Sequence, residues 1–203
     1  MTARPWSFQP LLLAIGFLIL IGISAASLWL VDQASDDAQS VAHTLDVQNK
    51  VSLIMLHLRR AESTQRGYII TSQPEYLQEY RESAGNVIPA VADAKTAIGD
   101  NPQQQQELSA LEKLVRIRLD DMERVVQLHD ANDRQTAYSM IQAGEGRRAM
   151  NQIRDLALRL LATERGLLEL RSQNSRTTNL WLLAVTLFGT TLILLIGASS
   201  VYL

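Results

Sequence analysis

The sequence predicts an all-α protein in which two transmembrane helices flank an extracytoplasmic antiparallel four-helix bundle. Residues 5–31 and 177–203 contain no charged side chain, although charged residues make up 20% of the 203-residue chain. Between these segments, apolar side chains recur at alternating spacings of three and four residues, which is typical of helices packed along one face. No stretch shows the strict apolar and polar alternation of a half-buried strand.

The first uncharged segment predicts a transmembrane helix over residues 10–31. It is almost continuously apolar, and about 20 helical residues span the hydrocarbon core of a bilayer. Trp6 and Trp29 flank it, as interfacial aromatic residues do. A cleaved signal peptide is the alternative, because Ser24-Ala25-Ala26 resembles a cleavage site. We favour a membrane span, because the segment stays apolar after Ala26 as far as Val31.

The second uncharged segment predicts another transmembrane helix over residues 180–203. A soluble helix that is apolar all round needs a large protein to cover it. Arg4 precedes the first span and three aspartates follow it, which places the N-terminus in the cytoplasm by the positive-inside rule. The expected domains are a cytoplasmic N-terminus (1–9), transmembrane helix 1 (10–31), a periplasmic helical bundle (32–179) and transmembrane helix 2 (180–203).

No basic residue follows the second span to anchor it in the cytoplasm. We therefore expect either that the chain is part of a longer protein or that a partner holds this end.

Composition excludes several function classes. All 21 acidic residues lie between Asp32 and Glu169, and 18 of the 19 basic residues lie between Lys50 and Arg176. This balanced middle lacks the basic patch that nucleic-acid binding needs. The chain has no cysteine, so disulfides and cysteine-ligated zinc are excluded. We find no phosphate-binding loop, Ser/His/Asp set or metal-spaced cluster, and we expect no catalytic residues, no metal and no cofactor.

Four main helices are expected between the spans. The first continues from the membrane and ends near Ser72, where Ser72-Gln73-Pro74-Glu75 predicts a capping box for the second. Gly99-Asp100-Asn101-Pro102 ends the second helix and caps the third. A polar turn over residues 129–133 and a short helix over 134–142 lead to Gly144-Glu145-Gly146, a loop that precedes the last helix.

Each main helix has a seam, a row of side chains at heptad spacing that faces the core. The seams are Val47, Val51, Ile54, Leu58, Ala61, Gln65 and Tyr68; Leu77, Tyr80, Ala84, Val87, Val91, Ala94 and Ile98; Leu108, Leu111, Val115, Met122 and Val125; and Met150, Ile153, Ala157, Leu160, Glu164, Leu167, Arg171 and Asn174.

Polar residues interrupt or adjoin these seams. Glu62 and Arg66 lie one turn apart beside Gln65, whereas Glu164 and Arg171 occupy the last seam itself. Three interpretations are open. These residues could form a structural layer that fixes helix register, they could form a two-state element whose side chains exchange partners when a signal arrives, or they could contact a ligand directly. We favour the structural layer. The glutamines at 103–106 are expected to be only a polar helix start.

The end of the first long helix resembles a known family. Ala61-Glu62-Ser63-Thr64-Gln65-Arg66-Gly67-Tyr68-Ile69-Ile70-Thr71, followed by Tyr76-Leu77 and Tyr80, looks like the hallmark of the third class of CHASE domains, the cyclase- and histidine-kinase-associated sensory extracellular domains of bacteria. Gly146, Met150, Ile153-Arg154, Glu164, Leu168 and Arg171 are similar to the closing motif of that family. The resemblance covers roughly residues 40–176.

The resemblance implies a sensory input module of a bacterial signal-transduction protein of the histidine kinase (two-component) or diguanylate cyclase type. Such a module is a multi-pass protein of the inner membrane that transmits its signal by helix displacement, and it is usually a homodimer. The implied partners are the lipid bilayer, a second copy, and a cytoplasmic output module or partner protein. Alternatives are a stand-alone two-span interaction or scaffold subunit and the input fragment of a chemotaxis receptor.

No ligand-binding residue is implied. The residues carried over as family-defining, or as a possible switch, are Glu62, Gln65, Arg66, Gly67, Tyr68, Thr71, Glu164 and Arg171.

Overall fold

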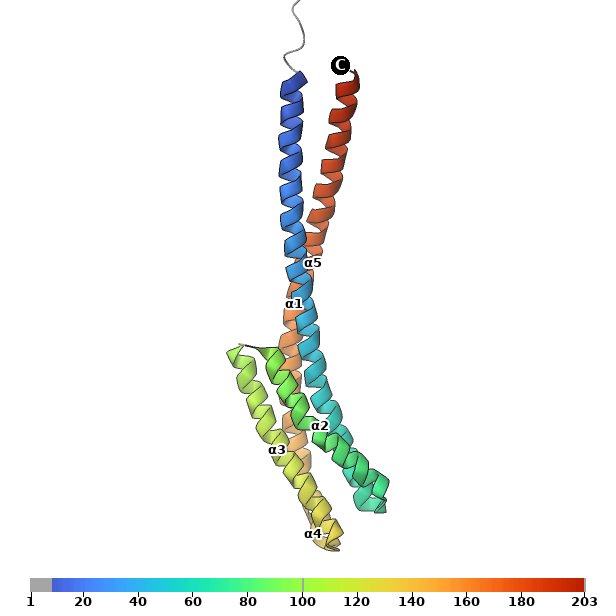
Figure 1. The fold of residues 1–203 in the computed structure, drawn as a ribbon. Helices are drawn as coiled ribbons and strands as arrows, with labels where there is room; N and C mark the ends of the chain where they lie inside the picture. The colour runs from blue at the N-terminus through green and yellow to red at the C-terminus, as the bar shows by residue number, and fades with distance from the viewer. Residues whose placement is uncertain (1–8, 100, 203) are drawn as a thin grey trace, which may run out of the picture. The chain divides into compact units, whose positions relative to one another are not determined.

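The computed structural model describes residues 9–99 and 101–202, without the side chains of residues 9–13, 15, 171, 172, 174, 175, 193 and 196–202. Throughout these residues the chain is helical apart from short turns, and the predicted all-α class is confirmed. The helices are α1 (Gln9–Thr71), α2 (Pro74–Ile98), α3 (Pro102–Asp130), α4 (Arg134–Gln142) and α5 (Glu145–Tyr202) (Figure 1).

The chain divides into two compact units. The terminal unit consists of Met1–Ala42 and Glu169–Leu203, and the central unit consists of His43–Leu168. Residues of α1 and α5 contribute to both units, whereas α2, α3 and α4 lie entirely within the central one.

The central unit has one main hydrophobic core, to which α1, α2, α3 and α5 all contribute. The predicted seams supply most of it, because heptad spacing keeps successive side chains on one face of each helix. The largest fully buried apolar side chains of this core are Val47, Val51, Ile54, Leu58, Tyr80, Val87, Leu108, Leu111, Met122, Ile153 and Leu160.

The turn between α1 and α2 corrects the predicted capping box. Ser72 has a positive φ of 55°, and its N–H donates to the Tyr68 carbonyl at 2.7 Å, so this residue ends α1. The N-cap of α2 is Gln73, whose side chain makes no capping hydrogen bond, and Pro74 follows as the first helical residue. From this turn α2 runs back in the direction opposite to the end of α1 (Figure 1). The serine hydroxyl cannot cap α2, because the left-handed turn directs it elsewhere.

The caps of α3 and α4 depend on side chains. Asn101 accepts from the Gln104 N–H at 3.3 Å, which confirms the predicted cap, and Asp133 accepts from the Thr136 N–H at 3.2 Å. The short helix lies over the predicted residues. The predicted turn at 129–133 begins later than expected, because α3 continues to Asp130.

The start of α5 also differs from the prediction. Gly144 has φ 74° and forms the turn, but Gly146 lies inside the first turn of the helix instead of in a loop.

The terminal unit exposes large apolar side chains along both of its helices. Leu18 and Leu187 are 68% and 67% exposed, and Phe17, Trp29, Trp181 and Phe188 are similar. Gly189 packs closely on Ile23, and the Thr178 hydroxyl donates to Asp37 at 3.0 Å.

One helix among the described residues, Gly16–Thr71, is long and apolar enough to cross a membrane, a test that a signal sequence also passes. The predicted cytoplasmic segment 1–9 lies almost entirely outside the described residues, and the side chains of residues 196–202, at the end of the predicted second span, are not described. The two-span arrangement therefore stays a prediction.

Candidate functional site

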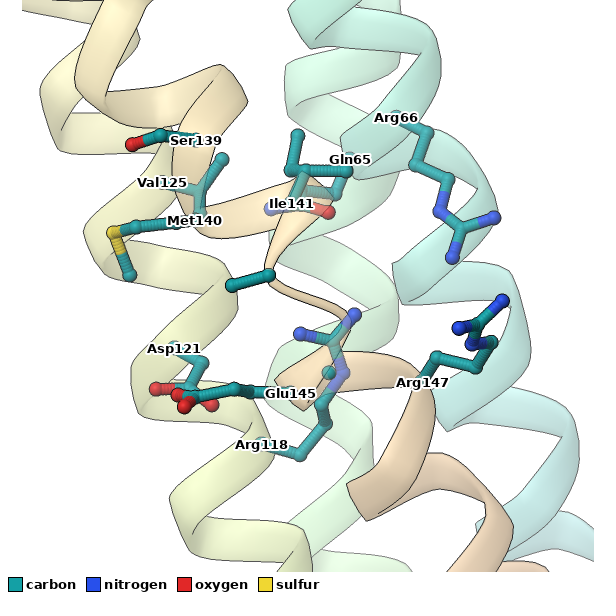
Figure 2. Close-up of a pocket in the computed structure, with 12 residues that line it drawn as sticks. Gln65, Arg66, Arg118, Asp121, Val125, Ser139, Met140, Ile141, Glu145 and Arg147 are labelled. Atoms are coloured by element: carbon teal, nitrogen blue, oxygen red, sulfur yellow. The ribbon is translucent and has the colours of Figure 1, made fainter.

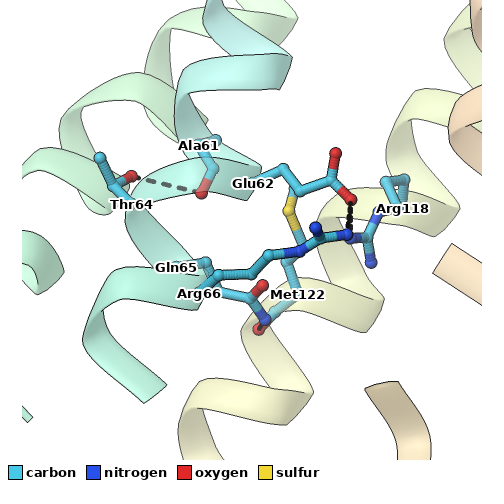
Figure 3. Close-up of polar contacts among 7 residues, drawn as sticks. All are labelled: Ala61, Glu62, Thr64, Gln65, Arg66, Arg118 and Met122. Atoms are coloured by element: carbon cyan, nitrogen blue, oxygen red, sulfur yellow. Dashed lines mark hydrogen bonds and ion pairs between the residues drawn. The ribbon is translucent and has the colours of Figure 1, made fainter. Parts of the chain in front are cut away.

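Three charged side chains meet between α1 and α3. Arg118 donates from Nη2 to Glu62 Oε1 at 3.0 Å, and Arg66 donates from Nη2 to the same oxygen at 2.9 Å (Figure 3). Arg118 is only 7% exposed. Glu62 therefore balances the charge of the nearly buried Arg118, and it also forms an i, i+4 ion pair with Arg66.

Gln65 lies beside this ion pair and is buried. Its side-chain amide donates to the Met122 carbonyl of α3 at 3.1 Å. That carbonyl remains available because a carbonyl oxygen has two lone pairs, one of which serves the α3 helix. The polar residue on the predicted α1 seam thus connects α1 to α3, and its role in fixing helix register stays a prediction.

Gly67 is required by a close contact. A Cβ atom at this position would lie 2.8 Å from Cδ1 of Tyr76, so the glycine allows the aromatic ring of α2 to lie against α1. Thr71 satisfies its hydroxyl locally by donating to the Gly67 carbonyl at 2.7 Å.

Tyr68 and Ser72 link the end of α1 to the end of α3. The Tyr68 hydroxyl donates to Asp130 at 2.5 Å, and its ring makes an edge-to-face contact with His129 at 5.1 Å between centroids. Ser72 Oγ lies 3.0 Å from His129 Nε2. The hydrogen bond to Asp130, followed by burial and the charge of Asp130, raises the pKa of Tyr68.

Tyr80, on α2, is buried and donates to Glu123 at 3.3 Å. Burial first, and then the nearby charge of Glu123, raise the pKa of the Tyr80 hydroxyl above its ordinary value.

A second polar contact lies between α3 and α5. Glu164 is 3% exposed and accepts a hydrogen bond from the side-chain amide of Gln104. Gln104 and Arg118 are 14 residues apart on α3, which corresponds to about 21 Å of helix. The structure therefore separates the predicted site residues into two polar layers. The Arg171 side chain lies outside the described residues.

Gln104 corrects the expectation that the glutamine run is only a polar helix start. Positions 104, 108, 111, 115, 118, 122, 125 and 129 continue one heptad seam, and all of them are buried. Extending the seam through its polar members would have found Gln104, Arg118 and His129. The predicted α3 seam contains only apolar residues, so it misses Gln104 and Arg118, the partners of Glu164 and Glu62.

A cavity of about 280 Å³ lies beside the first layer (Figure 2). It is lined from α1 by Gln65 and Arg66, from α3 by Arg118, Asp121 and Val125, and from α4, the following turn and the start of α5 by Ser139, Met140, Ile141, Ala143, Glu145, Gly146 and Arg147. Its wall therefore combines three guanidinium groups, two carboxylates and an apolar patch.

Comparison with known proteins decides the family. Residues 37–174, more than half of the chain, match the CHASE3 domain. The chain belongs to the CHASE3 family. A CHASE3 domain is a sensory module and not a catalytic one, and it serves as the extracellular sensor of a membrane protein.

The CHASE3 chain also has the fold of a solved sensor domain. The crystal structure of the Rhodopseudomonas palustris histidine kinase HK9 sensor domain is similar with a TM-score of 0.56, covering 60% of this chain and 95% of that chain. The two are 22% identical, so this likeness concerns the fold alone. No curated protein matches the chain.

In the described part of this CHASE3 chain, no three His, Asp or Glu side chains are grouped so that they could hold a metal ion.

Proposed function

We propose that the chain is the periplasmic input module of a bacterial inner-membrane signalling protein, of the histidine kinase or diguanylate cyclase type. One observation carries the proposal: α1 and α5 pack in the same central core, and each helix also has an uncharged apolar segment at its other end. In this proposal the central unit is an antiparallel four-helix bundle between two membrane spans.

Transmission in this proposal is a displacement of α1 relative to α5. Packed helices have discrete arrangements, so a small shift at a site becomes a switch and not a gradual deformation. The two polar layers define such arrangements, because Gln65 and Glu164 each have a buried partner on α3 that a displaced helix would lose.

A homodimer is part of the proposal, and a surface of the central unit suits it. A shallow apolar groove, lined by Leu53, Leu56 and Leu158 among others, runs between the outer faces of α1 and α5. Leu56 and Leu158 are 58% and 52% exposed. A second copy would bury this groove and remove apolar surface from water.

Cysteine cross-linking tests the displacement, and the absence of native cysteine gives a clean background. The pair Asp37→Cys and Thr178→Cys replaces two side chains that are hydrogen bonded at 3.0 Å in the terminal unit. We expect the oxidation yield in native vesicles to change when Glu164→Leu is added, because that variant leaves Gln104 without its buried partner. Ile23→Cys with Gly189→Cys provides a second reporter pair.

The outcomes separate the alternatives. Equal yields with and without Glu164→Leu, in a protein that stays folded, contradict helix displacement and leave Glu164 a structural residue. The mass of the native product, by immunoblot with an antibody to the central unit, then tests the output module. A band well above 22.6 kDa fits an input half, and a band at 22.6 kDa favours the stand-alone scaffold subunit.

A further inference from the structure

Arg118 holds a hydrogen-bond donor that the fold does not use. Its Nη2 pairs with Glu62, but within the part of the chain that the structure describes Arg118 Nε has no acceptor and is buried. A buried donor on a charged group is costly to leave without an acceptor. Arg118 lines the cavity (Figure 2), so an acceptor bound there would satisfy the buried Nε by drawing the guanidinium toward itself.

Gly146 shapes the cavity around this guanidinium. A Cβ atom at this position would lie 2.6 Å from Arg118 Nη1 and 2.7 Å from Cζ. The start of α5 can therefore approach Arg118 only because residue 146 has no side chain. The same close approach brings the first residues of α5 to the cavity wall, where the free amides of a helix N-terminus favour an anion.

From these contacts we propose that the cavity binds a small organic monocarboxylate with an apolar body. Arg118, with Arg66 and Arg147 on the same wall, would hold the carboxylate. Val125, Met140 and Ile141 would cover the apolar body. The proposal rests on the proposed sensory function and supplies the chemical class of its stimulus.

The two carboxylates of the cavity narrow the chemical class of the ligand. Asp121 and Glu145 also line it. When the ion-pair partners of the lining residues are counted, Arg148 with Glu145 at 3.7 Å and Glu62 with both Arg118 and Arg66, four arginines face three carboxylates, which leaves an excess of one positive charge. A single carboxylate matches that excess, whereas a dianion such as hydrogen phosphate would face repulsion from both acids. The same two acids could pair with an ammonium group, so an amino acid and a simple carboxylic acid share the recognised chemistry.

Calorimetric titration of the full chain in lipid nanodiscs tests the proposal. The probes are acetate, benzoate, 4-methylpentanoate and leucine, with 4-methylpentan-1-ol as the probe without a carboxylate. We expect saturable binding of at least one of the larger carboxylates and none of the alcohol. Tighter binding of leucine than of 4-methylpentanoate identifies amino acids as the source, and the reverse identifies simple acids.

Arg147→Gln is the main variant, because Arg147 is exposed and its loss spares the buried ion pair. We expect about tenfold weaker binding from the loss of one charge-assisted hydrogen bond. Gly146→Ala should weaken binding as well, by displacing the Arg118 guanidinium. Arg159→Gln is the control, since it removes the same charge from an exposed site on α5 outside the cavity lining.

Three results would overturn the inference: no binding of any of the four carboxylates at millimolar concentration, equal binding of the alcohol, or binding that Arg147→Gln and Arg159→Gln reduce alike. The cross-linking yield distinguishes this failure from failure of the sensory function. If the cross-linking yield still changes with Glu164→Leu, the proposed sensory function stands and only the proposed ligand class is rejected.

Discussion

At the scale of single residues, the nearly buried Arg118 forms an ion pair with Glu62, whose side chain is 15% exposed. Removing two charges from water is costly, and the cost is recovered only when the partners meet with good geometry. The pair satisfies this condition at 3.0 Å. Loss of Glu62 would leave Arg118 as a stranded charge, whereas Glu62 without Arg118 would keep its ion pair with Arg66 at 2.9 Å.

Truncation of Glu62 alone should therefore be more harmful than truncation of both partners. We expect Glu62→Met to destabilise the protein by about 3 kcal/mol, Arg118→Met to destabilise it less because Arg66 still pairs with Glu62, and the double variant to recover most of the loss caused by Glu62→Met. Chemical unfolding of the chain in detergent, followed by circular dichroism, measures the three values. Additive effects would show that the two side chains do not stabilise each other.

Gly67 gives a prediction with an internal control. Gly67→Ala should destabilise the protein by about 1–3 kcal/mol, since the new methyl group overlaps the Tyr76 ring. Gly85→Ala on α2 meets no atom within 4 Å and should instead stabilise the helix by about 0.5–1 kcal/mol. Thermal unfolding of both variants measures the difference, and equal shifts would remove the reason given for Gly67.

The raised pKa of Tyr80 predicts that the folded protein loses stability at alkaline pH. Burial raises its pKa in the folded protein, so the folded state keeps the phenolic proton where the unfolded state, with a pKa near 10, releases it. The stabilisation is complete below that value and is lost as the pH rises above it. Unfolding measured from pH 8 upward should show this loss, and Tyr80→Phe should reduce the slope. An unchanged slope would assign the alkaline effect to another group.

At the scale of elements, periodicity predicted the helices well and their ends less well. Spacing along α1 identified the core side chains from Val47 to Ala61 because heptad position alone decides which face is buried. The capping box failed because Ser72 belongs to two competing signals. Its short polar side chain suits an N-cap, but its backbone takes the left-handed conformation that ends α1.

The Asp133 cap should be important for the stability of the short helix α4. Asp133→Ala removes the side chain that accepts from the Thr136 N–H, and such losses cost about 0.5–2 kcal/mol. A helix of nine residues has few other interactions to hold its start. Hydrogen exchange of the α4 amides should therefore accelerate, while Asp155→Ala, an exposed acid within α5, should leave them unchanged. Unaltered exchange in both variants would show that tertiary packing alone holds α4.

At the scale of the whole molecule, the sequence predicted which face of each helix is buried but not which helices its polar side chains contact. The hallmark residues Glu62 and Gln65 were identified, yet their contacts with Arg118 and Met122 join positions 56 and 57 residues apart. Helical spacing carries no information about which neighbouring helix a polar side chain meets, or at what height. The cavity escaped sequence reasoning for the same reason, because its wall comes from four helices and a turn.

If the apolar groove of α1 and α5 is the dimer contact, a charge placed in it should prevent dimer formation. Leu56→Glu places a charge in the apolar groove of α1 and α5 and should convert a dimer into a monomer, as measured by sedimentation of the protein in detergent. Ile117→Glu is the matched control, because Ile117 is 45% exposed on α3 and does not line the groove. Dimers that survive Leu56→Glu would place the contact elsewhere.

The two polar layers give α3 a mechanical role. It is bonded to α1 through Met122 and Arg118 near one end and to α5 through Gln104 near the other. Because α1 and α5 are hydrogen bonded to α3 at different positions along its length, an axial slide of one helix past the other must tilt α3 or break one of these contacts. A slide of one helical turn, about 5.4 Å, exceeds what a hydrogen bond can stretch. In the proposed signalling mechanism, α3 would therefore limit the distance over which α1 and α5 can slide past each other.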